Sequence, residues 1–274
     1  MGDVQAKGEQ ARHSDTMRTA ARVGLAAFGL VHLLIAWLAL QIAWGHGGKA
    51  DSQGALQAVA KEPFGEVLLW IVAAGLLALT IWQVMTALWG HRSESDDKSR
   101  TMKRLAAVGR AVVYAAIGFS AARTASGSGS GGKSQDQKGE GLTADLLSAP
   151  AGRVLVAAIG IGILVVAARH VHRGVTDNFT HDLEAGATSG ASGSTIRLLG
   201  RSGYVGKGAA IGIVGVLFAW AALSYDADKA GGLDDALKTV RDQPFGPYLL
   251  SLVALGLAAF GLFCFAWARY VRTR

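Results

Sequence analysis

The chain has 274 residues, of which 51% are hydrophobic and only 17% are charged. Soluble domains usually carry about a quarter charged residues, so this composition excludes an ordinary soluble globular protein. The net charge is +7, but the cations lack the interleaved aromatic residues that a nucleic-acid surface would need. The single cysteine, Cys264, excludes an internal disulfide and a metal site built from several thiolates.

Six apolar stretches account for the low charge, and an apolar helix needs about 20 residues to cross the hydrocarbon layer. We therefore predict six transmembrane helices, at 23–44, 67–89, 105–122, 150–168, 204–225 and 247–268. Arg110, Arg153 and Lys207 lie in or beside these spans, near the ends, where long cationic side chains can reach the interface. No acidic residue lies within a span, which disfavours an ion-coupled carrier.

The segments between the spans differ in character. Apolar residues at helical spacing in 54–65 and 235–246 predict a short amphipathic helix at the outer interface in each segment. The corresponding segment 126–141 reads SGSGSGGKSQDQKGEG and predicts a flexible insert. A second polar segment, 177–202, is rich in Gly, Ser and Thr, and we expect it to be mobile as well.

The same pattern occurs three times, over 22–89, 104–168 and 201–268. Each copy has two apolar stretches joined by a segment that ends in Pro-x-Gly, with the proline expected in the first turn of the next span. Twelve residues after each proline stands a mid-span glycine. The repeated positions are Pro63, Gly65 and Gly75; Pro150, Gly152 and Gly162; and Pro244, Gly246 and Gly256.

Repetition of this kind indicates tandem structural units, here three helical hairpins that enter the membrane the same way round. We predict an all-α polytopic membrane protein, with six transmembrane helices as three tandem two-helix repeats in a pseudo-three-fold bundle. The predicted divisions are a polar cytoplasmic N-terminus (1–17), repeat 1 (18–92), repeat 2 (103–173), a cytoplasmic linker (177–199) and repeat 3 (200–272).

The mid-span glycines Gly75, Gly162 and Gly256 are candidate packing or axis positions. If they serve packing, replacing any of the three by leucine should lower thermal stability. If the axis holds a ligand, the same replacements should abolish binding and leave the protein folded.

Lysine and arginine set the orientation of a membrane protein. With both termini cytoplasmic, the inner segments hold twice as many of the 27 cationic residues as the outer ones. We therefore expect a multi-pass protein with N- and C-termini in the cytoplasm, where anionic leaflet lipids attract basic segments.

His32 is the strongest candidate for chemistry, because an ionisable group in mid-span is a functional hypothesis by default. The alternatives are a haem or metal ligand, a proton relay, or a neutral imidazole that is hydrogen-bonded to a neighbouring helix. In the repeat alignment His32 corresponds to Tyr114 and Ile211. A packing position tolerates that set of residues and a ligand position would not, so we favour a structural role for His32 and Tyr114.

Other candidates for chemistry are weaker. His170 and His172 are expected at a shallower depth than His32, which argues against a haem bound between them. The sequence DNFTHDLE suggests a metal site in isolation, from Asp177, His181, Asp182 and Glu184, but no second ligand cluster supports it. No nucleophile, base and oxyanion hole assemble, so we expect no enzyme, no cofactor and no metal.

The hairpin combines Arg-x-Gly, an apolar helix, G-A-L-x-x-x-A-x-x-P-F-G at 54–65 and a second apolar helix. This pattern resembles the actinobacterial membrane proteins of domain-of-unknown-function family 1206, over roughly 18–272. The family's Ala-Arg-Gly-x-x-Tyr motif is present in fragments: Arg110, Ala111 and Tyr114; Phe28, Gly29 and His32; Lys207, Gly208 and Ile211. The resemblance implies three tandem copies and a bacterial plasma membrane, and it implies no activity.

Two functions remain open. The first is a non-enzymatic scaffold or accessory protein that acts through helix packing with lipid or protein partners, which the glycine-rich spans favour. The second is a small transporter, channel or lipid-binding protein with a site on the pseudo-three-fold axis. A membrane enzyme or haem protein using His32 ranks last. The expected partners are membrane lipids, and either a membrane protein or a second copy of the chain, with no nucleic acid.

Overall fold

The computed structural model describes residues 15–45, 50–89, 97–127, 135–148, 152–184, 186–226, 229–230 and 232–271. Six helices are long and apolar enough to cross a membrane: α2 (Asp15–Ala43), α4 (Gly65–Trp89), α5 (Asp97–Ala125), α7 (Gly152–Val175), α8 (Gly190–Ser224) and α10 (Gly246–Arg269). Short helices join the two spans of each repeat: α3 (Ser52–Ala60), α6 (Gln135–Ser148) and α9 (Leu233–Arg241). Within these ranges the β-structure is one bridge, between Leu183 and Val271.

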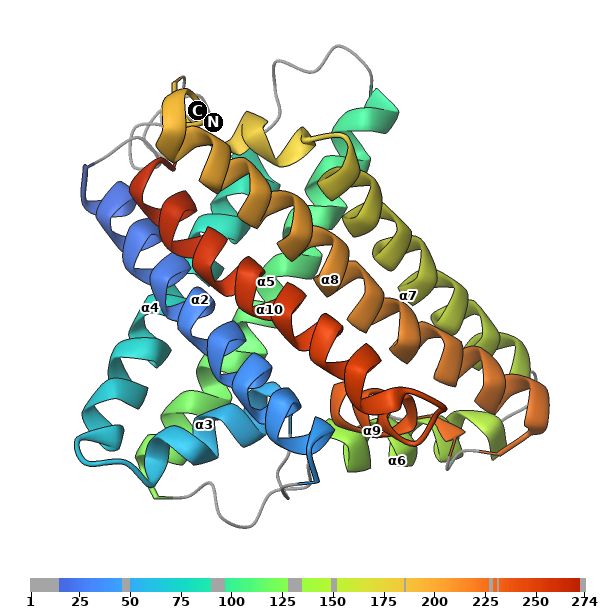
Figure 1. Ribbon diagram of the computed structural model, residues 1–274. Coiled ribbons are helices and arrows are strands. Elements are labelled where there is room, and N and C mark those ends of the chain that lie inside the picture. The colour runs from blue at the N-terminus through green and yellow to red at the C-terminus, as the bar shows by residue number, and fades with distance from the viewer. Residues whose placement is uncertain are drawn as a thin grey trace.

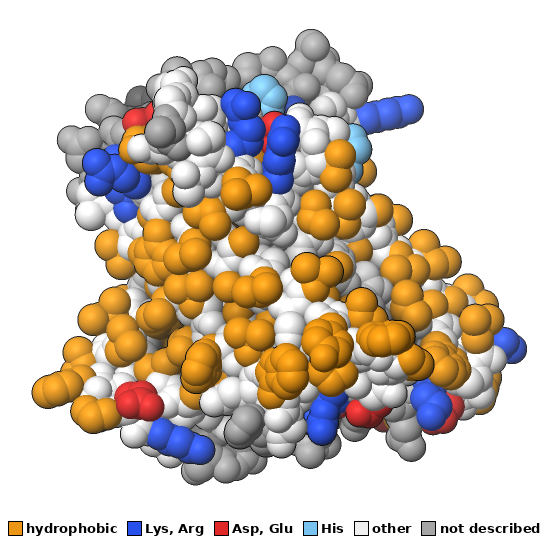
Figure 2. All heavy atoms as spheres, viewed as in Figure 1, with side chains coloured by type: hydrophobic (Ala, Val, Ile, Leu, Met, Phe, Trp, Pro, Cys, Tyr) orange, Lys and Arg blue, Asp and Glu red, His pale blue; other side chains and the backbone are white. Residues whose placement is uncertain are grey.

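The predicted fold class is confirmed: the protein is an all-α, multi-pass membrane protein built from three tandem repeats. Figure 1 shows that α2 begins and α10 ends on one side of the bundle, the terminal side, while α3, α6 and α9 lie on the other, the short-helix side. In Figure 2 a band of hydrophobic side chains crosses the middle of the molecule, with charged side chains above and below it.

The Pro-x-Gly motif of the first repeat is a tight turn that leads into α4. The Gly65 amide donates a hydrogen bond to the Glu62 carbonyl at 2.9 Å, and Phe64 has a φ of +64°. Proline at the second position and a left-handed third residue are typical of a type II turn. Pro63 therefore precedes α4. The expectation from the sequence that this proline lies in the first turn of the helix is wrong. A Cβ on Gly65 would overlap the Val59 carbonyl, so glycine is required there.

The third repeat has the same turn, in which the Gly246 amide donates to the Gln243 carbonyl at 2.7 Å. Pro244 again precedes its helix. Pro150 of the second repeat lies outside the described residues. A Cβ on Gly152 would nevertheless overlap a carbonyl oxygen of α6, just as a Cβ on Gly246 would overlap one of α9. The motif glycine thus lets each short helix close against the span that follows.

Two segments expected to be mobile contain helices. Residues 135–148 form α6, which packs on α7, so the last part of the predicted insert is helical, whereas 128–134 lies outside the described residues. The polar segment 177–202 forms the 3-10 helix η2 (Asn178–Asp182) and the first turns of α8. Phe179 of η2 is fully buried, because the linker packs against the helices on the terminal side of the bundle.

Arg153, one of the cations expected to reach the interface, caps the end of α8. Its guanidinium donates to the carbonyl oxygens of Ala222 and Leu223, at 2.8 and 3.3 Å. The last carbonyls of a helix have no partner within the helix. This contact therefore satisfies the end of α8 and ties α7 to it.

Each span packs against a span of another repeat. α4 lies against α5, α7 against α8, and α10 against α2. Within repeat 1, α2 also packs against α4, and within repeat 3, α8 packs against α10. Over their described lengths α5 and α7 have few or no contacts with one another, and Figure 1 shows them running apart toward the short-helix side. The pseudo-three-fold bundle is therefore incomplete at one of its three hairpins.

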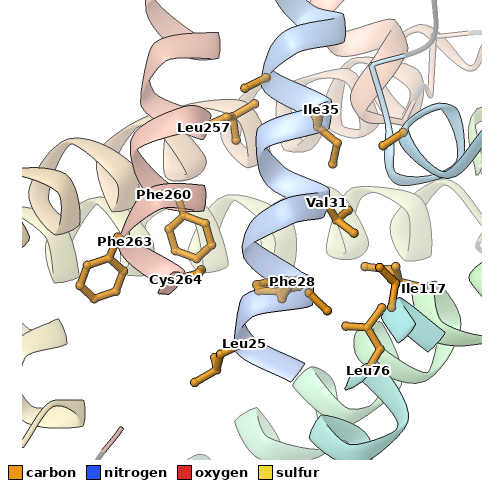
Figure 3. Packing of buried hydrophobic residues seen from close by; sticks show 14 of the residues in the cluster. Leu25, Phe28, Val31, Ile35, Leu76, Ile117, Leu257, Phe260, Phe263 and Cys264 are labelled. Carbon is orange, nitrogen blue, oxygen red and sulfur yellow. The ribbon is translucent and has the colours of Figure 1, made fainter. Parts of the chain in front are cut away.

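The hydrophobic core is centred on α2, the most buried of the six spans. Figure 3 shows Leu257 and Phe260 of α10 on one side of α2, and Leu76 and Ile117 of α4 and α5 on the other. Close approach of α2 to α10 depends on glycine, because a Cβ on Gly29 would lie 2.7 Å from a carbonyl oxygen of α10. Small residues at such contacts are typical of helix packing in membranes.

Candidate functional site

Aromatic side chains from four spans meet at the centre of the bundle. We call this group the aromatic core: Phe28, His32, Tyr114, Tyr204 and Phe260, all of them buried. The ring centroid of Phe28 lies 5.0 Å from that of Tyr114 and 6.2 Å from that of Phe260. His32 lies 4.3 Å from Phe28 and 4.9 Å from Phe260. His32 and Tyr114, singled out in the sequence, thus lie together.

His32 is bonded to its own helix, and not to a neighbouring one as the sequence analysis supposed. Its Nδ1 donates to the Phe28 carbonyl at 2.9 Å. Because a carbonyl can only accept, the neutral ring carries its proton on Nδ1. The difference in depth expected between His32 and His170 stays a prediction.

Lys207 of α8 is the member of this centre that the sequence analysis missed. Its Nζ lies 4.0 Å from the Phe260 ring centroid and 4.6 Å from that of Phe28. Contacts of a cation with a ring face stabilise the charge more strongly where water is excluded. α8 begins at Gly190, well before the predicted span, and the Lys207 side chain points toward the Phe28 and Phe260 rings. No described carboxylate pairs with the Lys207 ammonium.

Four basic side chains lie in this part of the bundle, and together we call them the cationic group: Arg110 of α5, His170 and Arg173 of α7, and Lys207. The charges of the other three all act on the His170 ring. Arg173 pairs with Asp182, lies 5.0 Å from the Tyr204 ring centroid and has a buried Nε without a partner among the described residues.

Arg110 is the member of the cationic group contributed by α5. Its charge acts on Tyr114 of the aromatic core. No carboxylate of the described chain pairs with it. Of the three fixed cations, Arg173 therefore pairs with Asp182, whereas Arg110 and Lys207 have no carboxylate partner in the described chain.

Two of the acidic residues that suggested a metal site, Asp177 and Asp182, pair with arginines instead. Arg201 donates two hydrogen bonds to Asp177, at 2.6 and 2.7 Å. These bonds hold the pKa of Asp177 below its usual value. Across the described ranges, no group of three or more His, Cys, Asp and Glu side chains is placed to hold a metal ion. The segment instead ties η2 to α7 and α8.

The mid-span glycines of repeats 1 and 3 lie where the two spans of a repeat touch, and we call these contacts the closed crossings. Gly75 of α4 meets Gly24 of α2, and a Cβ on Gly75 would lie 3.2 Å from the Gly24 Cα. Gly256 of α10 meets Gly206 of α8, and a Cβ on Gly256 would lie 2.6 Å from the Gly206 Cα. Neither contact leaves room for a side chain.

The second repeat has instead an open crossing, which we define by Gly109 of α5 and by Gly162 and Val166 of α7. A Cβ built on either glycine meets no described atom of another helix within 4 Å. Leu79 and Phe260, which occupy the position of Val166 in repeats 1 and 3, are 3% and 2% exposed, whereas Val166 is 48% exposed. Gly162, a predicted packing or axis position, therefore touches no neighbouring span.

The sequence did contain a signal for the cationic group. The repeat alignment puts Lys207 and Arg110 at the same position of the Ala-Arg-Gly motif, with Phe28 at that position in repeat 1. In the structure the Lys207 ammonium lies on the Phe28 ring, so these motif positions converge. The alignment could not supply the direction of the side chains, which depends on the tilt of α8.

The chain matches the family model described as Domain of Unknown Function (DUF1206) three times, over residues 23–90, 105–177 and 202–271. It is 30% identical to "Uncharacterized protein YxxB" of Bacillus subtilis (strain 168) over 242 residues, which are 88% of this chain and 86% of that protein. No solved structure matches the chain. Each family match coincides with one hairpin of the bundle, and the protein is therefore a triple-repeat member of the DUF1206 family.

Proposed function

We propose that this protein is a non-enzymatic accessory or scaffold protein of the bacterial plasma membrane, which binds a partner from the plane of the membrane at the open crossing. Its termini lie in the cytoplasm, as the distribution of lysine and arginine favours. The observation that carries the proposal is the contrast between Gly162, which meets no neighbour, and Gly75 and Gly256, which close their own repeats.

The open crossing has the character of a contact surface without its partner. Glycines in spans let another molecule approach the backbone closely, and both Gly109 and Gly162 are accessible. The neighbouring side chains are apolar and exposed, as a partner within the bilayer requires: Val108, Val112 and Val113 on α5, and Ile161, Val165 and Val166 on α7.

Binding from the side is favoured over transport along the axis, because the aromatic core fills the centre of the bundle. Phe28, Tyr114 and Phe260 are in ring contact there. Movement of a solute along the axis would require these packed rings to separate. Binding at the open crossing requires no such rearrangement.

Native mass spectrometry of the full chain, released from its host membrane, tests the proposal. We expect a stoichiometric bound mass in the wild type, lost in Gly162→Leu, which fills the open crossing. Ala74→Leu is the matched control, since Ala74 is an exposed small residue of α4, and it should keep the bound mass. A wild-type protein without bound mass, or equal loss in both variants, would overturn the proposal.

A further inference from the structure

We infer that the open crossing binds an anionic phospholipid, whose phosphate lies on the cationic group and whose acyl chains run along α5 and α7. The inference rests on the proposed function and adds to it the chemistry of the partner. Four observations carry it: the unbalanced charge, the occupied ring faces, the depth of the cations and the exposed apolar surface beside them.

The charge at the centre is not balanced within the described residues. Arg110, Arg173 and Lys207 carry three positive charges, and Asp182 supplies one negative charge to Arg173. Buried charges are normally paired, because desolvation without a counter-ion is costly. A phosphate group would supply the missing charge, and its oxygens could accept from the buried Arg173 Nε, which has no partner in the described chain.

The aromatic core favours an acidic headgroup over a zwitterionic one. A choline headgroup is held by aromatic faces, but the Lys207 ammonium already lies over the Phe28 and Phe260 rings. A quaternary ammonium brought to the same place would meet another cation. The site should therefore select lipids with a net negative charge, such as phosphatidylglycerol.

The cations lie at the depth of a headgroup phosphate. At 1.5 Å per residue, Lys207 lies about 25 Å along α8 from its end on the short-helix side, Arg110 about 22 Å along α5 and His170 about 27 Å along α7. The hydrocarbon core of a bilayer is about 30 Å thick. The cationic group therefore lies near the boundary between hydrocarbon and headgroups on the terminal side of the bundle.

Acyl chains have a surface on the same two helices. Gly109 and Gly162 leave the backbone accessible, and Val166, one helical turn before His170, is half-exposed. α5 and α7 diverge from the terminal side toward the short-helix side (Figure 1). A lipid of the terminal-side leaflet would thus have its phosphate at the cationic group and its chains where the two spans separate.

Lipid titration followed by native mass spectrometry tests the inference. The full chain, delipidated in neutral detergent, is titrated with dioleoyl phosphatidylglycerol or dioleoyl phosphatidylcholine. We expect one molecule of phosphatidylglycerol to bind about tenfold more tightly than phosphatidylcholine. Lys207→Met and Arg110→Gln should each weaken phosphatidylglycerol binding by about tenfold or more, since each removes a charged partner of the phosphate.

Arg123→Gln is the matched control, because Arg123 lies on the same helix at the short-helix side and contacts Phe119. It should leave phosphatidylglycerol binding unchanged. If Lys207→Met does not fold, Lys207→Arg, which keeps the charge, should bind phosphatidylglycerol like the wild type. The weaker binding expected for Arg110→Gln then tests the inference.

Several results would overturn the lipid assignment. These are equal affinity for the two lipids, displacement by millimolar inorganic phosphate, or equal effects of Arg110→Gln and Arg123→Gln. A copurifying protein subunit that is lost in Arg110→Gln, with no lipid preference, would also overturn it. A bound mass that is lost in Gly162→Leu and unchanged in Lys207→Met would leave the proposed function standing and reject an acidic headgroup.

Discussion

Repeats 1 and 3 close on themselves, whereas repeat 2 is divided between its neighbours. In the closed repeats a glycine of each span meets a glycine of the other, as Gly206 meets Gly256. In repeat 2 the corresponding Gly109 and Gly162 are both present and meet nothing within reach of a Cβ. A glycine at the right position therefore permits a close crossing and does not by itself create one.

The spans of repeat 2 are held by other repeats. Gly118 brings α5 against α4, where a Cβ would lie 3.2 Å from Leu76. Gly160 brings α7 against α8, where a Cβ would lie 2.8 Å from the amide of Ala219. The two spans of repeat 2 carry like charges, Arg110 on α5 and Arg173 on α7, and like charges oppose a dry contact between the helices. Closure of repeat 2 would bury these cations together.

The largest expected effect separates the closed crossings from the open one. Gly256→Leu places a side chain against the backbone of α8, which cannot be accommodated unless the helices separate. We expect failure to fold or a Tm lower by about 10 °C, which corresponds to roughly 3 kcal/mol or more for a chain of this size. Gly162→Leu should leave Tm unchanged within about 2 °C, because its side chain enters open space.

Gly75→Leu provides the second closed example and should also be destabilised. Thermal unfolding in detergent, followed by the fluorescence of the tryptophans, measures all three variants. If all three glycines served packing, as one hypothesis from the sequence holds, the three variants would be destabilised equally. That result would contradict the division into open and closed crossings.

The sequence predicted the fold well because the fold depends on local properties. Span length, the Pro-x-Gly turns and the period of the repeats are all readable along the chain, and they gave six spans in three hairpins. The open crossing of repeat 2 could not be predicted from the sequence, since Gly162 has the same spacing from its proline as Gly75 and Gly256. What differs is which neighbour each span prefers, and that depends on side chains distant in sequence.

The candidate site was found only in part for the same reason. His32 and Tyr114 were singled out as unusual residues in spans, and both lie in the aromatic core. Lys207 was expected only to reach the interface, because it stands near the start of an apolar stretch, and its contact with the Phe28 and Phe260 rings was not predicted. The helix in fact begins at Gly190, within a polar segment whose hydropathy alone could not indicate a helix.

A smaller effect of opposite sign is expected for alanine at two positions of α7. Gly160→Ala should lower stability by about 1–3 kcal/mol, because the Cβ would press on the backbone of α8. Gly162→Ala should raise it by up to about 1 kcal/mol, since alanine favours helix over glycine and no neighbour opposes it. The Tm of each variant, compared with that of the wild type, checks this prediction. A loss of stability at both positions would mean that another part of the protein covers Gly162.

The turns give a further difference between the repeats. Phe64 and Phe245 adopt a left-handed backbone and are 84% and 76% exposed, whereas the second repeat has Ala151 at this position. A non-glycine residue pays roughly 1–2 kcal/mol for that conformation. We expect Phe64→Gly to raise the stability of repeat 1 by about 0.5–1 kcal/mol and Phe64→Ala to leave the backbone strain in place. Equal Tm shifts for the two variants would mean that loss of the phenylalanine ring, and not relief of backbone strain, determines the change in stability.

The smallest effect concerns Asp177, at the end of α7 that packs on α8. Arg201 holds the pKa of Asp177 below its usual value of about 3.9, so the folded state binds this proton more weakly than the unfolded state. The bond therefore adds stability that is fully present above about pH 4 and is lost as the pH falls through the folded pKa. We expect the Tm of the wild type to exceed that of Asp177→Asn at pH 7 and the difference to shrink below pH 4.

Asp177→Asn also tests whether the packed side and the open side of α7 act independently. Asp177 ties η2 to α8 on the packed side of α7, while the proposed lipid surface lies on its open side. If the two sides are independent, Asp177→Asn should bind phosphatidylglycerol like the wild type at pH 7, despite its lower Tm. Weaker binding would instead mean that η2, through the pair of Arg173 with Asp182, positions the cationic group, and that the open crossing is held in shape by the closed part of the molecule.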